Sequence, residues 1–306
     1  DRTVLQMGAP AYSLLQQVTG ANVARSSFSV TGSGIGVAVL DSGLATHMDF
    51  NCTASITTVP NVSTNDYYGH GTHVAGILVG NSKAALKFGL NYAGMAPSAT
   101  LTTVKVLNDQ GHGQVSWVLA GMDWVLNNRT NRNIRVVNLS LGMPAVQSYD
   151  VDPLCQATKK LYNAGIVTVA AAGNYGKAAD GSVAYGSITS PGNSPWVITV
   201  GAVNDQGTAR RSDDRVASYS SRGPTRSYDY ATSTYDHLIK PELVATGNHL
   251  VAPEAANNWI VTNYPDFHLE DGSTNRAYMY LNGTSMAAPV VSGTVALMLH
   301  ANPALK

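Results

Sequence analysis

The chain has 306 residues, of which 44% are hydrophobic, enough to bury a large core as one α/β domain or two small ones. Only 12% of the residues are charged, and 19 Lys and Arg residues balance 19 Asp and Glu residues. This balance excludes the basic surface typical of nucleic-acid-binding or anionic-membrane-binding proteins. No apolar run approaches the roughly 18 residues that span a bilayer, so no transmembrane segment is predicted.

The ends of the chain predict a processed product, and its polar composition suits a secreted protein. The sequence begins with Asp1, without a Met or a signal-peptide pattern, and an apolar helical stretch near the other end stops at Lys306. We therefore expect a processed or trimmed product whose precursor continued beyond the C-terminus. The low charge is made up by Gly, Ser, Thr, Asn and Tyr, which suits an extracellular location.

The two cysteines, Cys52 and Cys155, are too few for a disulfide framework. Two separate, mostly buried thiols are favoured over a single bridge between them. Neither has a His neighbour or CxxC spacing, so neither is predicted to act in catalysis or metal binding.

Apolar stretches of strand length alternate with amphipathic stretches of helix length, which predicts βαβ units around a mainly parallel sheet. The expected strands are 35–40, 101–106, 135–139, 166–170 and 197–200. The expected helices include 116–127 and a helix from Pro153 to about Ala164, which Asp152 caps and Gly165 ends.

The rest of the pattern indicates one domain, 1–306. There is no internal repeat and no low-complexity linker. Two polar, aromatic segments, 225–238 and 249–280, have weak periodicity and are expected to be long surface excursions. Each interrupts the pattern near candidate functional residues, so each can shape substrate binding.

Asp41 follows directly on the apolar run 37–40 and precedes Ser42 and Gly43. Ligands of parallel α/β sheets bind beyond the carboxyl ends of strands, which places this carboxylate where chemistry occurs. Asp-Ser-Gly is also ordinary turn composition, so this segment alone does not decide between a catalytic group and a turn.

Segment 69–76 reads GHGTHVAG. Its glycines allow close backbone approach, Thr72 can cap a helix, and the small residues behind His73 let that helix pack closely. Two histidines three residues apart also suggest a metal site. They lack the i, i+4 spacing of a zinc helix, however, and no ligand-rich segment follows. The segment therefore predicts a general base, His73.

Segment 282–293 reads NGTSMAAPVVSG and places Ser285 in the first turn of a helix. A hydroxyl there is open to substrate, and the free N–H groups of the helix end face any developing oxyanion. Pro289 loosens a backbone hydrogen bond about one turn in, for which a purely structural helix has little use. The alternative is an ordinary Ser/Thr cap on a buried helix.

Together the three segments resemble the Asp, His and Ser motifs of the subtilisin-like serine proteases (subtilases, peptidase family S8), in that family's chain order. Similarity to the family runs from about Gly34 to the C-terminus. The resemblance implies a three-layer α/β fold with a mainly parallel central sheet and helices on both faces. It also implies a secreted serine endopeptidase with Ser285 as nucleophile, His73 as general base and acid, and Asp41 holding the histidine.

Two further segments extend the resemblance. Segment 169–174, VAAAGN, resembles the family's oxyanion-hole motif, which implies that Asn174 and the Ser285 N–H bind the oxyanion. Segment 137–142, VNLSLG, resembles its substrate-pairing strand. The substrate-binding residues implied in this way are Ser140, Leu141, Gly142, Ala171, Ala172 and Gly173.

The residues at these positions also bear on specificity. The resemblance implies that these segments wall the S1 pocket, which binds the P1 side chain, with 187–191 near its base. None of the three segments contains an acidic residue. We expect uncharged, apolar or aromatic P1 residues and not the dibasic specificity of kexin-like relatives.

Sedolisins, an acid-adapted class, use Glu as base and Asp at the oxyanion position. His73 and Asn174 at these positions favour the neutral-to-alkaline mechanism.

The implied mechanism needs no cofactor, but many subtilases bind structural calcium. Asp49 matches a calcium ligand of the family, whereas the partner loop 81–87, NSKAALK, has two lysines and few oxygen ligands, so the calcium question stays open.

The implied partners are protein or peptide substrates and an inhibitory N-terminal propeptide in the precursor zymogen. A catalytically dead scaffold and a narrow processing protease are the alternatives. None of the predicted catalytic residues is replaced by another residue type, which disfavours the catalytically dead scaffold.

Overall fold

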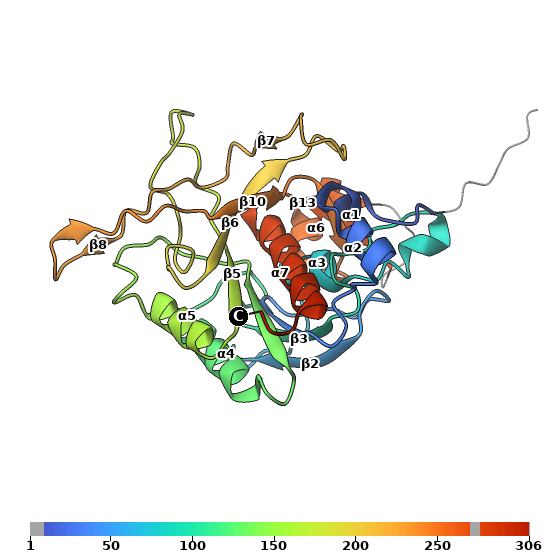
Figure 1. Ribbon diagram of the computed structural model, residues 1–306, viewed down its shortest axis with the longest axis horizontal. Coiled ribbons are helices and arrows are strands. Elements are labelled where there is room, and N and C mark those ends of the chain that lie inside the picture. Colours follow the sequence, from blue (N-terminus) through green and yellow to red (C-terminus); the bar gives the residue numbers. More distant parts are fainter. Residues whose placement is uncertain (1–8, 270–275, 306) are drawn as a thin grey trace, which may run out of the picture.

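The computed structural model describes residues 9–269 and 276–305 (Figure 1). Its central sheet follows the order β10-β6-β5-β4-β1-β3-β2, and each neighbouring pair on this path is parallel. The strands are β1 (Gly36–Asp41), β2 (Cys52–Thr57), β3 (Thr100–Lys105), β4 (Ile134–Leu139), β5 (Val167–Ala171), β6 (Ile198–Asn204) and β10 (Leu243–Thr246). A short strand, β7 (Arg215–Val216), pairs antiparallel with β6.

The predicted strands are confirmed, with small differences at their ends. β1 is buried along its whole length, as expected for a parallel strand covered on both faces. The edge strands β2 and β10 were not predicted. β2 alternates between half-buried and exposed residues because it has a neighbour on one side only, so it lacks an apolar run.

Helices cover both faces of the sheet, which confirms the predicted three-layer fold (Figure 1). One face packs against α3 (His70–Val79) and α7 (Thr284–Ala301), and the other packs against α4 (Val115–Asn128) and α5 (Pro153–Asn163). α7 is long and apolar enough, by length and composition alone, to cross a membrane. However, 67% of it is buried inside the protein, as in the core helix of a soluble protein.

The predicted helix caps are confirmed. The Asp152 carboxylate accepts the Leu154 N–H at 2.8 Å, Pro153 begins α5, and Gly165 has a φ of 76° just beyond its end. Cys155 lies buried in α5 and Cys52 lies on the edge strand β2. Both are free thiols, as favoured from the sequence.

The two predicted excursions differ. In segment 225–238, β8 (Tyr228–Asp229) and β9 (Thr234–Tyr235) form a hairpin that projects from the body (Figure 1). For segment 249–280 the prediction is partly wrong, because β11 (Leu250–Pro253) and β13 (Tyr278–Leu281) pair in a mostly buried sheet. Strands of four residues are too short for periodicity to reveal. Residues 270–275 lie outside the described residues.

Several short elements complete the fold. They are α1 (Leu14–Thr19), α2 (Ala21–Phe28), η1 (Ala85–Phe88), α6 (Trp259–Asn263), η2 (Pro265–Phe267) and β12 (His268–Leu269).

Candidate active site

The candidate site forms where the carboxyl ends of the central strands meet the start of α7. Asp41 is the last residue of β1, Ser140 directly follows β4, and Asn174 lies three residues beyond β5. These strands are neighbours in the order β5-β4-β1, so the fold brings together side chains that are far apart in sequence.

His70, and not His73, pairs with Asp41. The Nδ1–H of His70 donates to Asp41 Oδ1 at 2.8 Å, and the Ser42 N–H donates to the same oxygen at 2.8 Å. Asp41 is 1% exposed, whereas the His70 side chain is 16% exposed. Gly71 permits the approach, because a Cβ at this position would collide with the backbone that follows Asp41.

The prediction that Asp41 holds His73 is therefore wrong. His73 lies one turn inside α3, is fully buried, and its Nε2–H donates to the Leu250 carbonyl at 3.0 Å. Burial, helped by the neighbouring His70, lowers the pKa of His73 to about 3. It is a neutral core histidine that joins α3 to β11.

The sequence carried a signal that distinguishes the two histidines. His70 has glycine on both sides and begins the helix, so its ring can leave the helix end toward the neighbouring strand end. His73 belongs to the run 71–79, in which every residue is buried. A histidine inside such a run is more readily a core residue than a base.

The electrostatics of His70 suit a general base. Burial acts to lower the pKa of His70, but the charge and hydrogen bond of Asp41, with a smaller contribution from the charge of Asp66, outweigh it and raise the pKa. Because Nδ1–H is held by Asp41, the lone pair of the neutral ring is on Nε2.

Ser285 is the second residue of α7 and is partly exposed. Its hydroxyl donates to the Ser140 carbonyl at 3.1 Å, and the Ser140 hydroxyl donates back to the Ser285 carbonyl at 2.7 Å. This reciprocal pair joins the start of α7 to the end of β4. Ser140 also lines, with His70, a cavity of about 510 Å³.

Asn174 lies beside the same helix end. Its Oδ1 accepts both the backbone N–H and the hydroxyl of Thr284, each at 3.0 Å. The Thr284 hydroxyl in turn accepts the Gly173 N–H at 3.1 Å. With the oxygen held in this way, the amide NH₂ of the exposed Asn174 is oriented and available to an anion.

The predicted S1 segments meet at Thr189. The Thr189 N–H donates to the Ala172 carbonyl, and Met143 and Ser190 exchange backbone hydrogen bonds. A Cβ on Gly142 would lie 2.6 Å from Thr189 Oγ1, and one on Gly173 would lie 2.7 Å from its Cγ2. Glycine is therefore required at both places for the walls to close on Thr189.

Asp49, the candidate calcium ligand, has both carboxylate oxygens in hydrogen bonds within the protein. Its Oδ1 accepts the Ala84 N–H at 3.0 Å and its Oδ2 accepts the Tyr278 hydroxyl at 2.6 Å. Each oxygen therefore already gives one lone pair to a hydrogen-bond donor of the protein. Across residues 9–269 and 276–305 there is no group of three His, Cys, Asp or Glu side chains that could hold a metal ion.

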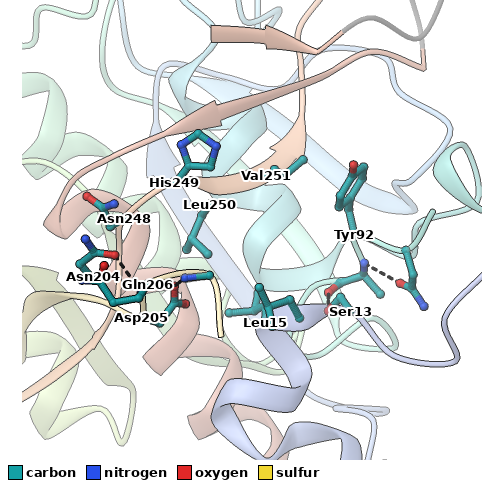
Figure 2. A pocket seen from close by; sticks show the side chains of 14 residues that line it. Ser13, Leu15, Tyr92, Asn204, Asp205, Gln206, Asn248, His249, Leu250 and Val251 are labelled. Carbon is teal, nitrogen blue, oxygen red and sulfur yellow. Dashed lines mark hydrogen bonds between the residues drawn. The ribbon is translucent and has the colours of Figure 1, made fainter. Parts of the chain in front are cut away.

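Figure 2 shows a second cavity, of about 480 Å³, lined by a different set of residues. Leu15 of α1, Leu250 and Val251 of β11, and Tyr92 line its apolar part. Its carboxylate, Asp205, already accepts the Gly207 N–H and the Thr246 hydroxyl. None of the Asp41, His70 or Ser285 side chains lines it.

The fold and the site define a class, that of α/β proteins with an Asp-His pair and a helix-start serine at the carboxyl ends of the central strands. Residues 32–306 match the model of the subtilase family, and the chain belongs to that family. By this membership it contains a subtilisin-like domain.

The relatives agree with this assignment. The chain is 38% identical to serine protease AprX of Bacillus subtilis over 92% of its own length and 61% of that of AprX. It is 38% identical to subtilisin Savinase of Lederbergia lenta, over 90% and 79% of the two lengths. The crystal structure of a cold-adapted subtilisin-like serine proteinase superposes with a TM-score of 0.62, at 28% identity over 89% and 77% of the chains.

Proposed function

We propose that the protein is a secreted serine endopeptidase in which Ser285 is the nucleophile, His70 the general base and acid, and Asp41 the group that orients His70. The observation that carries the assignment of the base is the 2.8 Å hydrogen bond between the buried Asp41 and His70 Nδ1. Ser285 is supported by its place at the start of α7 and by its bond to Ser140, which lines the same cavity as His70.

Catalysis begins when the Ser285 hydroxyl exchanges its hydrogen bond with Ser140 for one with His70 Nε2. Hydrogen bonds of this kind often form fully only with substrate bound. His70 takes the hydroxyl proton as oxygen attacks the scissile carbonyl, then gives it to the leaving amine. Water repeats the sequence on the acyl-enzyme. No step needs a cofactor.

The oxyanion of each tetrahedral intermediate is proposed to bind the Asn174 amide and the Ser285 N–H. Support comes from the fixed Asn174 oxygen, which orients its NH₂ group. The Ser285 N–H belongs to the first turn of α7, where N–H groups have no partner within the helix.

Substrate is proposed to pair with the backbone of Ser140, Leu141 and Gly142, and its P1 side chain to enter between Gly142 and 171–173. This pocket has no charged wall, so we expect uncharged P1 residues. A peptide-library profile dominated by P1 Arg or Lys would overturn this expectation. The low charge of the chain supports secretion, and family resemblance supports a single catalytic domain and an N-terminal propeptide in the precursor.

The decisive experiment compares fluorophosphonate labelling and peptide hydrolysis of the wild type with three variants. Ser285→Ala is expected to abolish labelling, and His70→Ala to lower kcat by about 10⁶-fold, a magnitude known for subtilisin itself. His73→Gln is the matched histidine control. It is expected to lose stability and to keep most of its activity, whereas full activity in His70→Ala would refute the assignment.

A narrow processing protease is the second candidate, favoured by the projecting hairpin of β8 and β9 and by the inserted α6. A casein digest compared with a panel of defined peptides separates the two. Broad casein degradation supports the general endopeptidase.

A further inference from the structure

Asp66 is a fully buried carboxylate next to the Asp41–His70 pair, and the proposed reaction gives it no direct part. Four donors surround it. The Ser42 hydroxyl and the Gly69 N–H donate to Oδ1, each at 2.8 Å. The Thr72 N–H and hydroxyl donate to Oδ2 at 2.7 and 2.6 Å.

The two hydroxyls donate to Asp66, and each also accepts a backbone N–H. Ser42 Oγ accepts from Gly71 at 2.9 Å, and Thr72 Oγ1 accepts from Ala45 at 3.0 Å. Burial raises the pKa of Asp66, and the four hydrogen bonds oppose the rise. An environment made only of donors suits the ionised carboxylate.

These partners belong to the two segments that carry the catalytic pair. Ser42 follows Asp41 and its N–H donates to the Asp41 carboxylate, while Gly69 precedes His70. Asp66 thus ties the turn after β1 to the first turn of α3. A shift of either segment would change the distance between Asp41 Oδ1 and His70 Nδ1.

We propose that Asp66 is a positioning residue for the reaction, which aligns the Asp41–His70 pair through Ser42 and Gly69 and adds a second negative charge that favours the imidazolium. The proposal rests on the proposed function, in which His70 takes and returns a proton. Asp66 contacts neither the cavity nor Ser285, so it acts through the two residues of the pair.

The proposal that the charge of Asp66 favours the imidazolium of His70 can be tested, because the other charged groups near His70 are known. Asp41 from β1, Asp66 and Tyr68 from the preceding segment, and His73 from α3 act on or contact His70, and His112 lines the same cavity. A further buried cation, Lys105 of β3, is paired with Asp109 and bonded to the carbonyl of Asn65. The negative charges that act on His70 are those of Asp41 and Asp66.

The test is Asp66→Asn, which keeps the size of the side chain but removes its charge. It also places an NH₂ group opposite hydrogen-bond donors that now meet a carboxylate oxygen. We expect kcat to fall about 10–100-fold, the range caused by a small displacement of a catalytic group, with KM unchanged. The acidic limb of kcat/KM should move to lower pH, because removal of the negative charge lowers the pKa of His70. Nuclear magnetic resonance titration of His70 in a Ser285→Ala background should show the same shift without any need for activity.

Asp49→Asn is the matched control, since Asp49 is an equally buried carboxylate at the other end of α3. It should lower the melting temperature and leave kcat and both pH profiles unchanged. If Asp66→Asn behaves in the same way, Asp66 is structural only and the proposal is wrong. Failure of the proposed function appears differently, as a wild type that fluorophosphonate does not label.

Ser42→Ala keeps the test decisive if Asp66→Asn does not fold. It removes the hydroxyl that bridges Gly71 N–H and Asp66 while retaining both carboxylates. We expect a smaller fall in kcat and no change in KM. A kcat equal to that of the wild type would contradict the positioning role.

Discussion

His70 and His73 lie one helical turn apart, and their surroundings set opposite protonation behaviour. Asp41 raises the pKa of His70, while burial lowers that of His73 to about 3. The distinction arises because β1 ends in a carboxylate beside the first residue of α3, whereas the polar neighbours of the buried His73 are the backbone groups of Leu250 and Met279.

The raised pKa of His70 predicts the pH dependence of the reaction. His70 must be neutral to take the Ser285 proton, so kcat/KM of the wild type should fall on the acidic side with a midpoint above about 6.5, the ordinary value for histidine. Asp41→Asn should move this midpoint to lower pH and lower kcat by about 10⁴-fold. Initial rates measured from pH 5 to 10 check both effects, and an unmoved midpoint would argue against the pair.

Asn174→Ala measures how much the proposed oxyanion site contributes to kcat. We expect kcat to fall about 10²–10³-fold with little change in KM, which is the effect known for the same residue type in subtilisin itself. Thr284→Val is the graded comparison, because it removes one of the two bonds that hold Asn174 Oδ1. It should cost less activity than Asn174→Ala, and steady-state kinetics would expose the reverse order.

At the scale of elements, both ends of α3 are held by buried carboxylates. Asp66 binds its first turn, and Asp49 binds the segment beyond its last turn through the Ala84 N–H. The Tyr278 hydroxyl strengthens the link between Asp49 and this segment, because it donates to Asp49 and accepts the Ala85 N–H at 3.0 Å. Hydrogen bonds to Asp49 thus hold the segment around Ala84 and Ala85 in place, at the position where the family resemblance implies a calcium ligand.

Tyr278→Phe should destabilise the protein by about 1–3 kcal/mol, because it leaves two buried polar groups without this partner. Chelator should leave the melting temperature of the wild type unchanged if no calcium acts here. Melting curves in a Ser285→Ala background, which prevents autolysis, check both statements. A chelator effect that Asp49→Asn removes would show that Asp49 binds a cation after all.

Sequence patterns predicted the elements whose burial is uniform. β1, β4 and the capped helix α5 were visible because long apolar runs and the Asp152-Pro153 start are local signals. β11 and β13 were missed because strands of four residues are recognised only by their mutual pairing. Asp41 and Ser285 could be proposed from motifs. The glycines on both sides of His70 were a local signal in its favour, but only the structure shows that its ring meets Asp41 at the end of β1.

At the scale of the molecule, the packed core and the proposed catalytic residues share one face of the sheet. α3 and α7 pack together against this face and also carry His70 and Ser285 at their first turns. His73 contributes to the same packed layer through its bond to Leu250. The core that holds the two helices therefore contains a titratable group that must stay neutral.

The neutral state of His73 predicts acid sensitivity of the whole fold. Its pKa is about 3 in the folded protein and about 6.5 when unfolded, so only the unfolded chain takes up a proton between these values. Folding free energy should therefore be lost below about pH 6.5, by about 3 kcal/mol from this group between pH 7 and pH 4. Denaturant unfolding of Ser285→Ala, with and without His73→Gln, measures the contribution, because the other titrating groups cancel in the comparison. The glutamine variant should be less stable at pH 8 but show a flatter dependence on pH, and equal slopes would mean that His73 does not sense acid.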